Sequence, residues 1–312
     1  MSQESAPLVS IGIPLYKSRR FLDCIVANIE AIEYAPVEII ISDRHGDADD
    51  TIELLKLKFT DDPRVRFISR RDELDWVEHY NSLLETATGE YFFWMPHDDS
   101  FPSNYISQLV AELEQNPDTT LAFGYIKTVS LEDTPDSLPV YPLPPLESEE
   151  AWSPRVALRL LTSWNLGIPF RGIFRREAVI RDGLYIRPTR GNVLADMYWV
   201  FGLSLRARLA FVPACYCVKH YYPTSTHAHW RVGARHMIDA FFVLRSYVRD
   251  LSARRRDACH GVATIFCWTL SRLLWIAGNR FLIVSVAKPT LKKTLDAALR
   301  FLTGSRVHKH LR

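Results

Sequence analysis

The chain has 312 residues, of which 47% are apolar and 24% charged, a composition typical of a soluble globular protein with one large domain or two smaller ones. Its formal net charge of +2 excludes the strongly basic surface that general nucleic-acid binding needs. Five scattered cysteines are too few for a disulfide framework, and the N-terminal MSQESAPLVS lacks the apolar core of a signal peptide. We therefore expect reduced thiols and a cytoplasmic protein.

Predicted strands and helices alternate along the first half of the chain. Apolar runs predict strands at residues 8–14, 37–42, 64–69, 91–95 and 121–129. Helical periodicity predicts four helices between these strands. The first is capped by Ser18, the second begins at Thr51, the third spans 75–88, and the fourth has Pro102 in its first turn. This alternation predicts a mostly parallel sheet covered on both faces, in which ligands bind beyond the carboxyl ends of the strands.

Three of these strand ends carry unusual side chains, namely Pro14-Leu15-Tyr16-Lys17, Asp43, and His97-Asp98-Asp99. Adjacent carboxylates repel each other and cannot enter an apolar core unpaired, so the pair Asp98-Asp99 alone is compatible with a solvated turn. The convergence of three such ends at one edge of the sheet favours a site for a metal ion and phosphate groups instead.

The second half of the chain begins with residues 131–149, whose five prolines predict a linker or a flap near a site. A helix is expected after Ser153, followed by a strand, a short helix and a turn at Gly183. A helix at 195–207 and strands at 209–212 and 215–220 come next, and from His227 the pattern is helical.

Six runs in this order resemble family 2 glycosyltransferases: VSIGIPLYK, EIIISDRHGDADDT, TGEYFFWMPHDDSFP, GIFRREAVIRDGLY, LADMYWVFGLSLRARLAFVP and KHYYPTST. The resemblance covers roughly residues 8–230. It implies an α/β fold of the GT-A type, a Rossmann-like, mostly parallel sheet flanked by helices. The expected parts are a disordered tail (1–7), a nucleotide-sugar-binding half (8–130), an acceptor-side half of the same domain (131–230) and a helical C-terminal extension (231–312).

The resemblance assigns the first two strand ends to the nucleotide. Pro14, Leu15 and Tyr16 would lie along the base and the ribose, with the Tyr16 ring available for stacking, and Asp43 would accept hydrogen bonds from the base. An aromatic residue in the core at Tyr16 and an Asx turn or helix cap at Asp43 are the alternatives. We expect Asp49 to be a turn and cap residue.

The D-x-D motif of the family corresponds here to His97-Asp98-Asp99, with histidine in place of the first aspartate. By this correspondence Asp99 would bind Mn²⁺ or Mg²⁺, and Asp98 would contact the ribose or another metal-held group. Such ions take few protein carboxylates because diphosphate oxygens complete their coordination. His220 is a candidate further metal ligand; the register of KHYYPTST leaves Tyr222, His227 and His229 as alternatives, and a structural histidine remains open.

Asp196 occupies the place of the family's general base at a helix start, where Ala195 replaces the usual glutamate. The alternative is a helix N-cap, which the helix dipole also favours.

The C-terminal residues 231–312 lie outside the resemblance. Val262 to Ala287 is apolar but interrupted by Arg272, Asn279 and Arg280, so it is too short for a membrane span. Together with neighbouring basic residues it predicts either peripheral contact with an anionic membrane surface, or a helical cap folded onto the core or a dimer surface.

These features predict an inverting, metal-dependent glycosyltransferase. It would move a sugar from a nucleoside diphosphate donor to a hydroxyl of a glycan or glycolipid acceptor. Two alternatives stay open: a nucleotide- or glycan-binding relative without turnover, for which Ala195 is a hint, and a sugar-nucleotide pyrophosphorylase. The latter would need a glycine-rich loop after the first strand, which IPLYKSRR lacks.

Overall fold

The structure is a computed structural model that describes residues 6–44, 49–69, 73–131, 161, 167–222, 232–251, 261–270 and 272–273. These residues belong to two compact units. The first lies within Met1–Leu143, Ile168–Ile186 and Arg208–Ala228, and the second within Pro144–Gly167, Arg187–Ala207 and His229–Arg312. The helix expected after Ser153 and, apart from Leu131, the proline-rich segment fall outside the described residues.

The first unit contains one sheet of eight strands in the order β3-β2-β1-β4-β7-β6-β8-β5. The strands are β1 (Val9–Leu15), β2 (Val37–Asp43), β3 (Val65–Ser69), β4 (Tyr91–Trp94), β5 (Asp99–Ser100), β6 (Thr119–Ser130), β7 (Ile173–Arg175) and β8 (Arg208–Tyr221). β1 to β4 pair in parallel, as does β6 with β8, whereas β7 and β5 pair antiparallel with their neighbours. The predicted α/β class is confirmed, with a mixed rather than wholly parallel second half.

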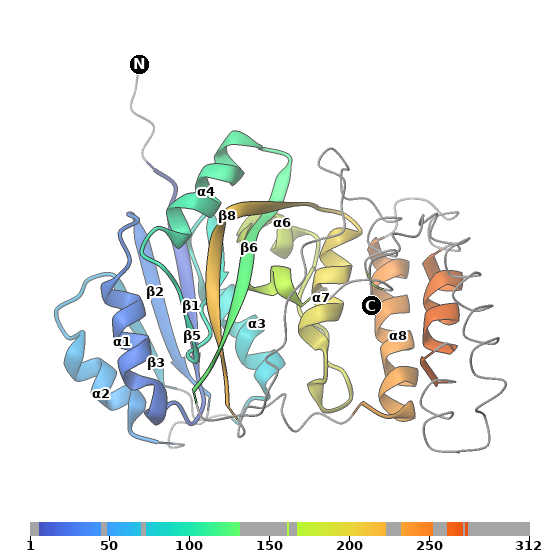
Figure 1. The fold of residues 1–312 in the computed structure, drawn as a ribbon, viewed down its shortest axis with the longest axis horizontal. Coiled ribbons are helices and arrows are strands. Elements are labelled where there is room, and N and C mark those ends of the chain that lie inside the picture. The colour runs from blue at the N-terminus through green and yellow to red at the C-terminus, as the bar shows by residue number, and fades with distance from the viewer. Residues whose placement is uncertain are drawn as a thin grey trace. The chain divides into compact units, whose positions relative to one another are not determined.

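Helices connect the parallel strands as the periodicity predicts. They are η1 (Arg19–Phe21), α1 (Leu22–Glu30), α2 (Thr51–Lys58), α3 (Trp76–Thr86) and α4 (Tyr105–Gln115). Right-handed crossovers place α1 and α2 on one face of the parallel strands, and α3, which leads back across the sheet to β4, on the other (Figure 1). Because helices cover both faces, all seven residues of β1 are buried.

Three local predictions were wrong. Ser18 occupies the N-cap position of η1, but its side chain makes no capping hydrogen bond and instead accepts from the Tyr16 amide at 2.9 Å. Pro102 precedes α4, whose N-cap is Asn104. The two strands expected at 209–212 and 215–220 form the single strand β8, because pairing with β6 continues through a register shift between Phe123 and Tyr125.

A short segment returns the chain to the sheet after the proline-rich region. It comprises η2 (Ile168–Arg171), β7 and α6 (Arg176–Arg181), and it ends at Gly183, where φ is 61°. A positive φ suits glycine, which has no Cβ, and the predicted turn is confirmed.

The described part of the second unit is helical, with η3 (Arg190–Asn192), α7 (Ala195–Ser204), α8 (Ala234–Leu251) and a further helix over 261–270. α7 is buried around most of its circumference, and at Gly202 it packs against the Tyr247 ring of α8. None of the helices that the structure describes has the length and apolar character needed to cross a membrane.

Candidate functional site

The carboxyl ends of β1 and β2 bring the first two predicted strand-end motifs together. Leu15 and Asp43 are register partners, and the Arg44 amide donates to the Leu15 carbonyl at 3.1 Å. Asp43 is buried, whereas the Tyr16 ring is 36% exposed, with the Arg44 guanidinium 4.4 Å from its centroid. Lys17 adopts the left-handed region at φ 51°. Left-handed backbone at a non-glycine residue is strained, and such strain clusters at functional sites.

The third motif joins the same edge through His97. The ladder between β1 and β4 extends past Trp94, because the Met95 amide donates to the Gly12 carbonyl at 3.0 Å. His97 Nδ1 then lies 3.1 Å from the Pro14 carbonyl oxygen. A carbonyl only accepts, so Nδ1 carries the proton in this contact. The chain segments at Pro14, Asp43 and His97 therefore share one edge of the sheet, as predicted.

Two side chains bind Asp98: His220, near the end of β8, and Tyr222, which follows β8. The Tyr222 hydroxyl donates to Asp98 Oδ2 at 2.8 Å, and His220 Nδ1 donates to the Asp98 carbonyl at 2.7 Å. Burial alone would raise the pKa of Asp98, but the charges of His97 and Lys219 and the hydrogen bond from Tyr222 outweigh it and lower the pKa to about 2. Asp98 is therefore a carboxylate at neutral pH.

Asp99 has different surroundings from those expected for a metal ligand. It lies in β5 opposite Lys219 and is completely buried. Its Oδ2 accepts from Arg171 Nε at 2.6 Å, and its carbonyl accepts from Asn28 Nδ2 at 2.8 Å. Within the part of the chain that the structure describes, its buried Oδ1 has no hydrogen-bond partner. Asp99 thus carries an ion pair in the interior rather than a side chain facing solvent.

The Asp98 side of this cluster offers two groups that could hold a divalent cation, the Asp98 carboxylate and the His220 imidazole. Histidine ligands usually donate their second ring N–H to a carbonyl or carboxylate, as His220 does, and this leaves Nε2 for the metal. The described residues hold no group of three or more His, Cys, Asp or Glu side chains suited to a metal. Oxygen atoms of a bound diphosphate would therefore supply most of the coordination, as is usual for Mg²⁺. His227 and His229 lie outside the described residues.

Asp196 belongs to the second unit, in the first turn of α7. It is not the N-cap, which is Leu194 at φ 60° in the left-handed region. Gly191 and Asn192 also have positive φ, at 60° and 53°. Such conformations cost about 1–3 kcal/mol each in non-glycine residues and cluster at functional sites. The strained loop is braced by the Asp239 carboxylate, which accepts from the Arg190 amide at 2.6 Å.

Two side chains that hold Asp99, Arg171 and Asn28, were not predicted as site residues from the sequence. Neither has a local signal: Arg171 is one of several arginines between 171 and 181, and Asn28 stands on the buried side of α1 like an apolar residue. The turn role predicted for Asp49 is confirmed, since its carboxylate accepts from the Thr51 and Arg19 amides at 3.0 Å each, whereas the N-cap of α2 is Asp50.

Known structures share this fold. Residues 1–349 of TarS from S. aureus, in complex with UDP-GlcNAc, superpose with a TM-score of 0.65 at 13% identity, covering 95% of this chain and 81% of that one. The mannosyltransferase PcManGT from Pyrobaculum calidifontis, in complex with GDP-Man and Mn²⁺, gives a TM-score of 0.55 at 20% identity and the same coverage. At these identities the similarity establishes the fold alone.

Sequence relatives agree with the fold. An uncharacterized glycosyltransferase of Haemophilus influenzae is 29% identical over 126 residues, which are 40% of this chain and 39% of that protein. The glycosyltransferase GlyG of Streptococcus pneumoniae serotype 4 is 27% identical over 108 residues, 35% of this chain and 36% of GlyG. The matched segments thus span well under two thirds of these relatives. The profile of Glycosyl transferase family 2 matches residues 10–182, more than half of the chain. The predicted resemblance is confirmed: the chain belongs to glycosyl transferase family 2 and has a GT-A-type fold.

Proposed function

We propose that this protein transfers a sugar from a nucleoside diphosphate donor to an acceptor hydroxyl, with inversion at the anomeric carbon and with help from a divalent cation. The observation that carries the proposal is the gathering of Tyr16, Asp43, Asp98 and His220 around one edge of the sheet in the first unit. Two neighbours of the same fold have solved structures in complex with sugar nucleotides, TarS with UDP-GlcNAc and PcManGT with GDP-Man.

The donor's base and ribose occupy the Pro14–Tyr16 and Asp43 side in this proposal. The half-exposed Tyr16 ring offers a flat apolar surface for a base to stack on. Asp43 stands at the adjacent strand end and would accept hydrogen bonds from the base.

In this proposal the metal ligands are Asp98 and His220, whereas the sequence resemblance assigned the metal to Asp99. Asp98 is ionised, and it lies beside a histidine whose tautomer is fixed by the backbone. Asp99 stays with Arg171 and keeps β5 in place. When bound, Mn²⁺ or Mg²⁺ offsets the charge of the diphosphate leaving group.

Asp196 is the proposed general base. An acceptor hydroxyl is a weak nucleophile at neutral pH unless a carboxylate takes its proton as the new bond forms. One displacement on the face opposite the diphosphate inverts the anomeric centre. The strained backbone of Gly191, Asn192 and Leu194 supports this role, because a plain helix start needs no such strain.

The acceptor in this proposal is a hydroxyl of a glycan or a glycolipid. A glycolipid acceptor lies in a membrane, so the proposal includes peripheral contact with an anionic membrane surface through the C-terminal helices.

Nucleotide release in the presence of candidate donors tests the proposal. The full chain is incubated with UDP- and GDP-sugars, with and without Mn²⁺ and with a glycan acceptor mixture, and free nucleoside diphosphate is measured. We expect release that needs both metal and acceptor. Metal-dependent binding of the nucleotide without release in any combination would favour the binding-protein alternative, for which Ala195 in place of glutamate is the sequence hint.

A further inference from the structure

One outward stripe of α8 combines arginines with large apolar residues. Its members are Arg235, Ile238, Phe242, Arg245 and Arg249, spaced at alternating intervals of three and four residues. At about 100° per residue they fall within an arc of roughly 80°. All five are exposed, Ile238 at 48% and Phe242 at 58%. The opposite side of the helix is buried, through residues such as Ala240, Leu244 and Tyr247.

The helix over 261–270 extends this stripe with two more apolar residues. Phe266 is 56% exposed and Leu270 37%. The Phe241 ring lies between the two helices, 5.4 Å from the Phe242 ring and 6.1 Å from the Phe266 ring. Figure 1 shows α8 and this helix side by side. We call the combined surface the arginine–phenylalanine face: Arg235, Ile238, Phe242, Arg245, Arg249, Phe266 and Leu270.

We infer that the arginine–phenylalanine face docks onto the surface of an anionic lipid bilayer. Exposed aromatic and aliphatic side chains are unfavourable in water and gain free energy at the boundary between headgroups and acyl chains. Arginines on the same face would lie at the level of the lipid phosphates, where their long side chains reach the headgroups. The inference specifies the membrane contact proposed above and does not depend on the transfer reaction.

The charges on this face favour an anionic partner over a second copy of the chain. In a symmetric dimer the same surface meets itself, so an antiparallel contact centred on Phe242 would bring Arg235 close to Arg249 of the other copy. Like charges at such a contact are unfavourable. The nearest acidic residues of α8, Asp239 and Asp250, lie outside the stripe, and both carboxylates already accept hydrogen bonds, Asp239 from the Arg190 amide and Asp250 from the Arg249 side chain.

Vesicle co-sedimentation of the full chain tests the inference. The lipids are phosphatidylcholine alone, and phosphatidylcholine mixed with phosphatidylglycerol. We expect binding to the mixed vesicles only, weakening as sodium chloride is raised. Replacing the three arginines (R235Q, R245Q and R249Q together) should lower the partition coefficient by on the order of 10²-fold. Replacing the rings (F242S with F266S) should abolish binding at any salt concentration.

Matched variants in the first unit serve as controls. K58Q, R181Q and R208Q remove the same number of exposed charges elsewhere, and L57S removes an apolar residue that is 76% exposed. Both controls should bind vesicles like the parent, and circular dichroism and nucleotide affinity should be unchanged in all variants. Equal loss in the controls, equal binding to neutral vesicles, or no binding to either lipid would overturn the inference. So would a concentration-dependent dimer in light scattering that F242S abolishes, because the face would then join two copies.

Discussion

Two neighbouring aspartates, Asp98 and Asp99, face different environments because Asp98 lies in a turn and Asp99 begins β5. The Asp99 amide closes this turn by donating to the Pro96 carbonyl at 3.3 Å. Asp98 meets the Tyr222 hydroxyl, while Asp99 is buried against Arg171. A buried carboxylate is tolerated only when it is paired, and the Arg171 guanidinium supplies that pairing over a sequence separation of 72 residues. The adjacent charges thus have two separate sets of partners.

Replacing each aspartate with asparagine should distinguish the proposed metal role of Asp98 from the structural role of Asp99. D98N should lower Mn²⁺-dependent affinity for a nucleoside diphosphate at least tenfold, as is typical for a lost metal ligand or its supporting group. It should also lower the free energy of unfolding, but by less than D99N, because the folded protein favours the charged form of Asp98. D99N should instead lower the free energy of unfolding by about 3–5 kcal/mol, because the ion pair between Arg171 and the buried Asp99 loses its negative charge. Calorimetric titration and urea unfolding of both variants provide the measurements. If D99N lost the metal-dependent affinity and D98N lost the stability instead, Asp99 would be the metal ligand.

Asp196 can be tested in the same way. D196N keeps the shape of the side chain and removes its basicity, so turnover should fall by ~10²-fold or more while nucleotide affinity stays near that of the parent. D250N is the matched control, since Asp250 is an exposed carboxylate of the same unit. If nucleotide affinity and turnover of D196N fell by the same factor, Asp196 would be a residue that binds the donor. If D196N did not fold, Asp196 would be a structural residue of the helix start.

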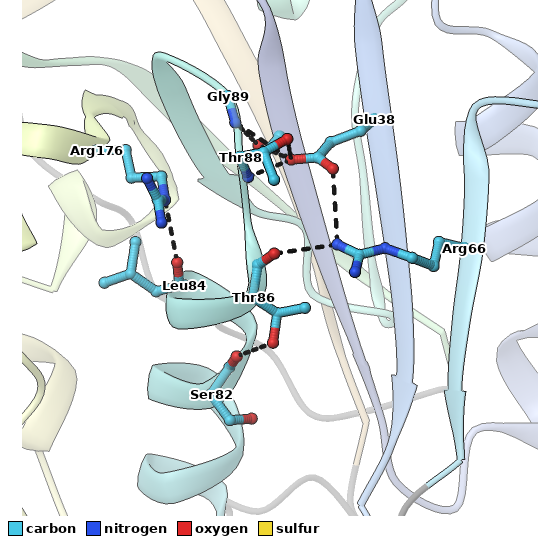
Figure 2. A network of polar contacts seen from close by, with 9 residues as sticks. Glu38, Arg66, Ser82, Leu84, Thr86, Thr88, Gly89 and Arg176 are labelled. Carbon is cyan, nitrogen blue, oxygen red and sulfur yellow. Dashed lines mark hydrogen bonds and ion pairs between the residues drawn. The ribbon is translucent and has the colours of Figure 1, made fainter.

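At the scale of elements, one carboxylate ties β2 to the turn between α3 and β4. Glu38 Oε1 accepts from the Thr88 amide at 2.5 Å, the Thr88 hydroxyl at 2.9 Å and the Gly89 amide at 3.2 Å, as well as from the Ser10 hydroxyl (Figure 2). Arg66 donates to the Thr86 carbonyl and Arg176 to the Leu84 carbonyl, in the last turn of α3. Carbonyls at a helix end need such donors. The network positions β4, which delivers His97 to the site.

This network makes stability depend on pH through Glu38. Burial would raise the pKa of Glu38, but the hydrogen bonds from Ser10, Thr88 and Gly89 outweigh it and lower the pKa from the ordinary 4.5. A lowered folded-state pKa stabilises the protein above pH 4.5 and loses that contribution as the pH falls below it. E38Q should cost about 1–2 kcal/mol at neutral pH and flatten the decline in acid. Urea unfolding across this pH range, with the exposed Glu85→Gln as control, provides the measurement. An unchanged acid slope in E38Q would contradict the assignment.

At the scale of the whole molecule, the residues proposed to bind the donor and the proposed base belong to different compact units. The fold of the second unit depends on the close packing of α7 against α8. A Cβ at Gly202 would come within 2.4 Å of the Tyr247 ring, and the Tyr247 hydroxyl accepts from the Arg187 amide at 3.1 Å. The same ring therefore supports the helix pair and the start of the loop that leads to Asp196.

Substitution of Gly202 should perturb the second unit alone. Alanine usually stabilises a helix interior relative to glycine, but G202A should destabilise the second unit by about 1–3 kcal/mol because the Tyr247 ring must shift. Calorimetry of the full chain should show a lower unfolding temperature, while nucleoside diphosphate affinity, which we propose to reside in the first unit, should persist. G233A is the control, since its Cβ would meet its nearest atom only at 3.9 Å. Parent-like stability in G202A would contradict this packing.

Local patterns in the sequence were enough to predict much of the first unit. β1, β2, β3 and β4 lie within one or two residues of their expected bounds, and the burial of Phe21, Ile25 and Ile29 follows from helical periodicity. The order of six short motifs was enough to identify the family. These features could be predicted because hydrophobic periodicity and turn chemistry act between residues that are near one another in the chain.

The tertiary structure alone decided which way each site residue points. The sequence by itself determined that Pro14, Asp43 and the His97-Asp98-Asp99 motif would meet at one sheet edge, because strand ends of a parallel sheet converge there. It did not determine that Asp98 would face His220 and Tyr222 while Asp99 faced Arg171. Those contacts bridge 72 to 124 residues and depend on the antiparallel pairing of β5 with β8. Side-chain direction along a strand reverses with a register shift of one residue, and register is a property of the folded sheet.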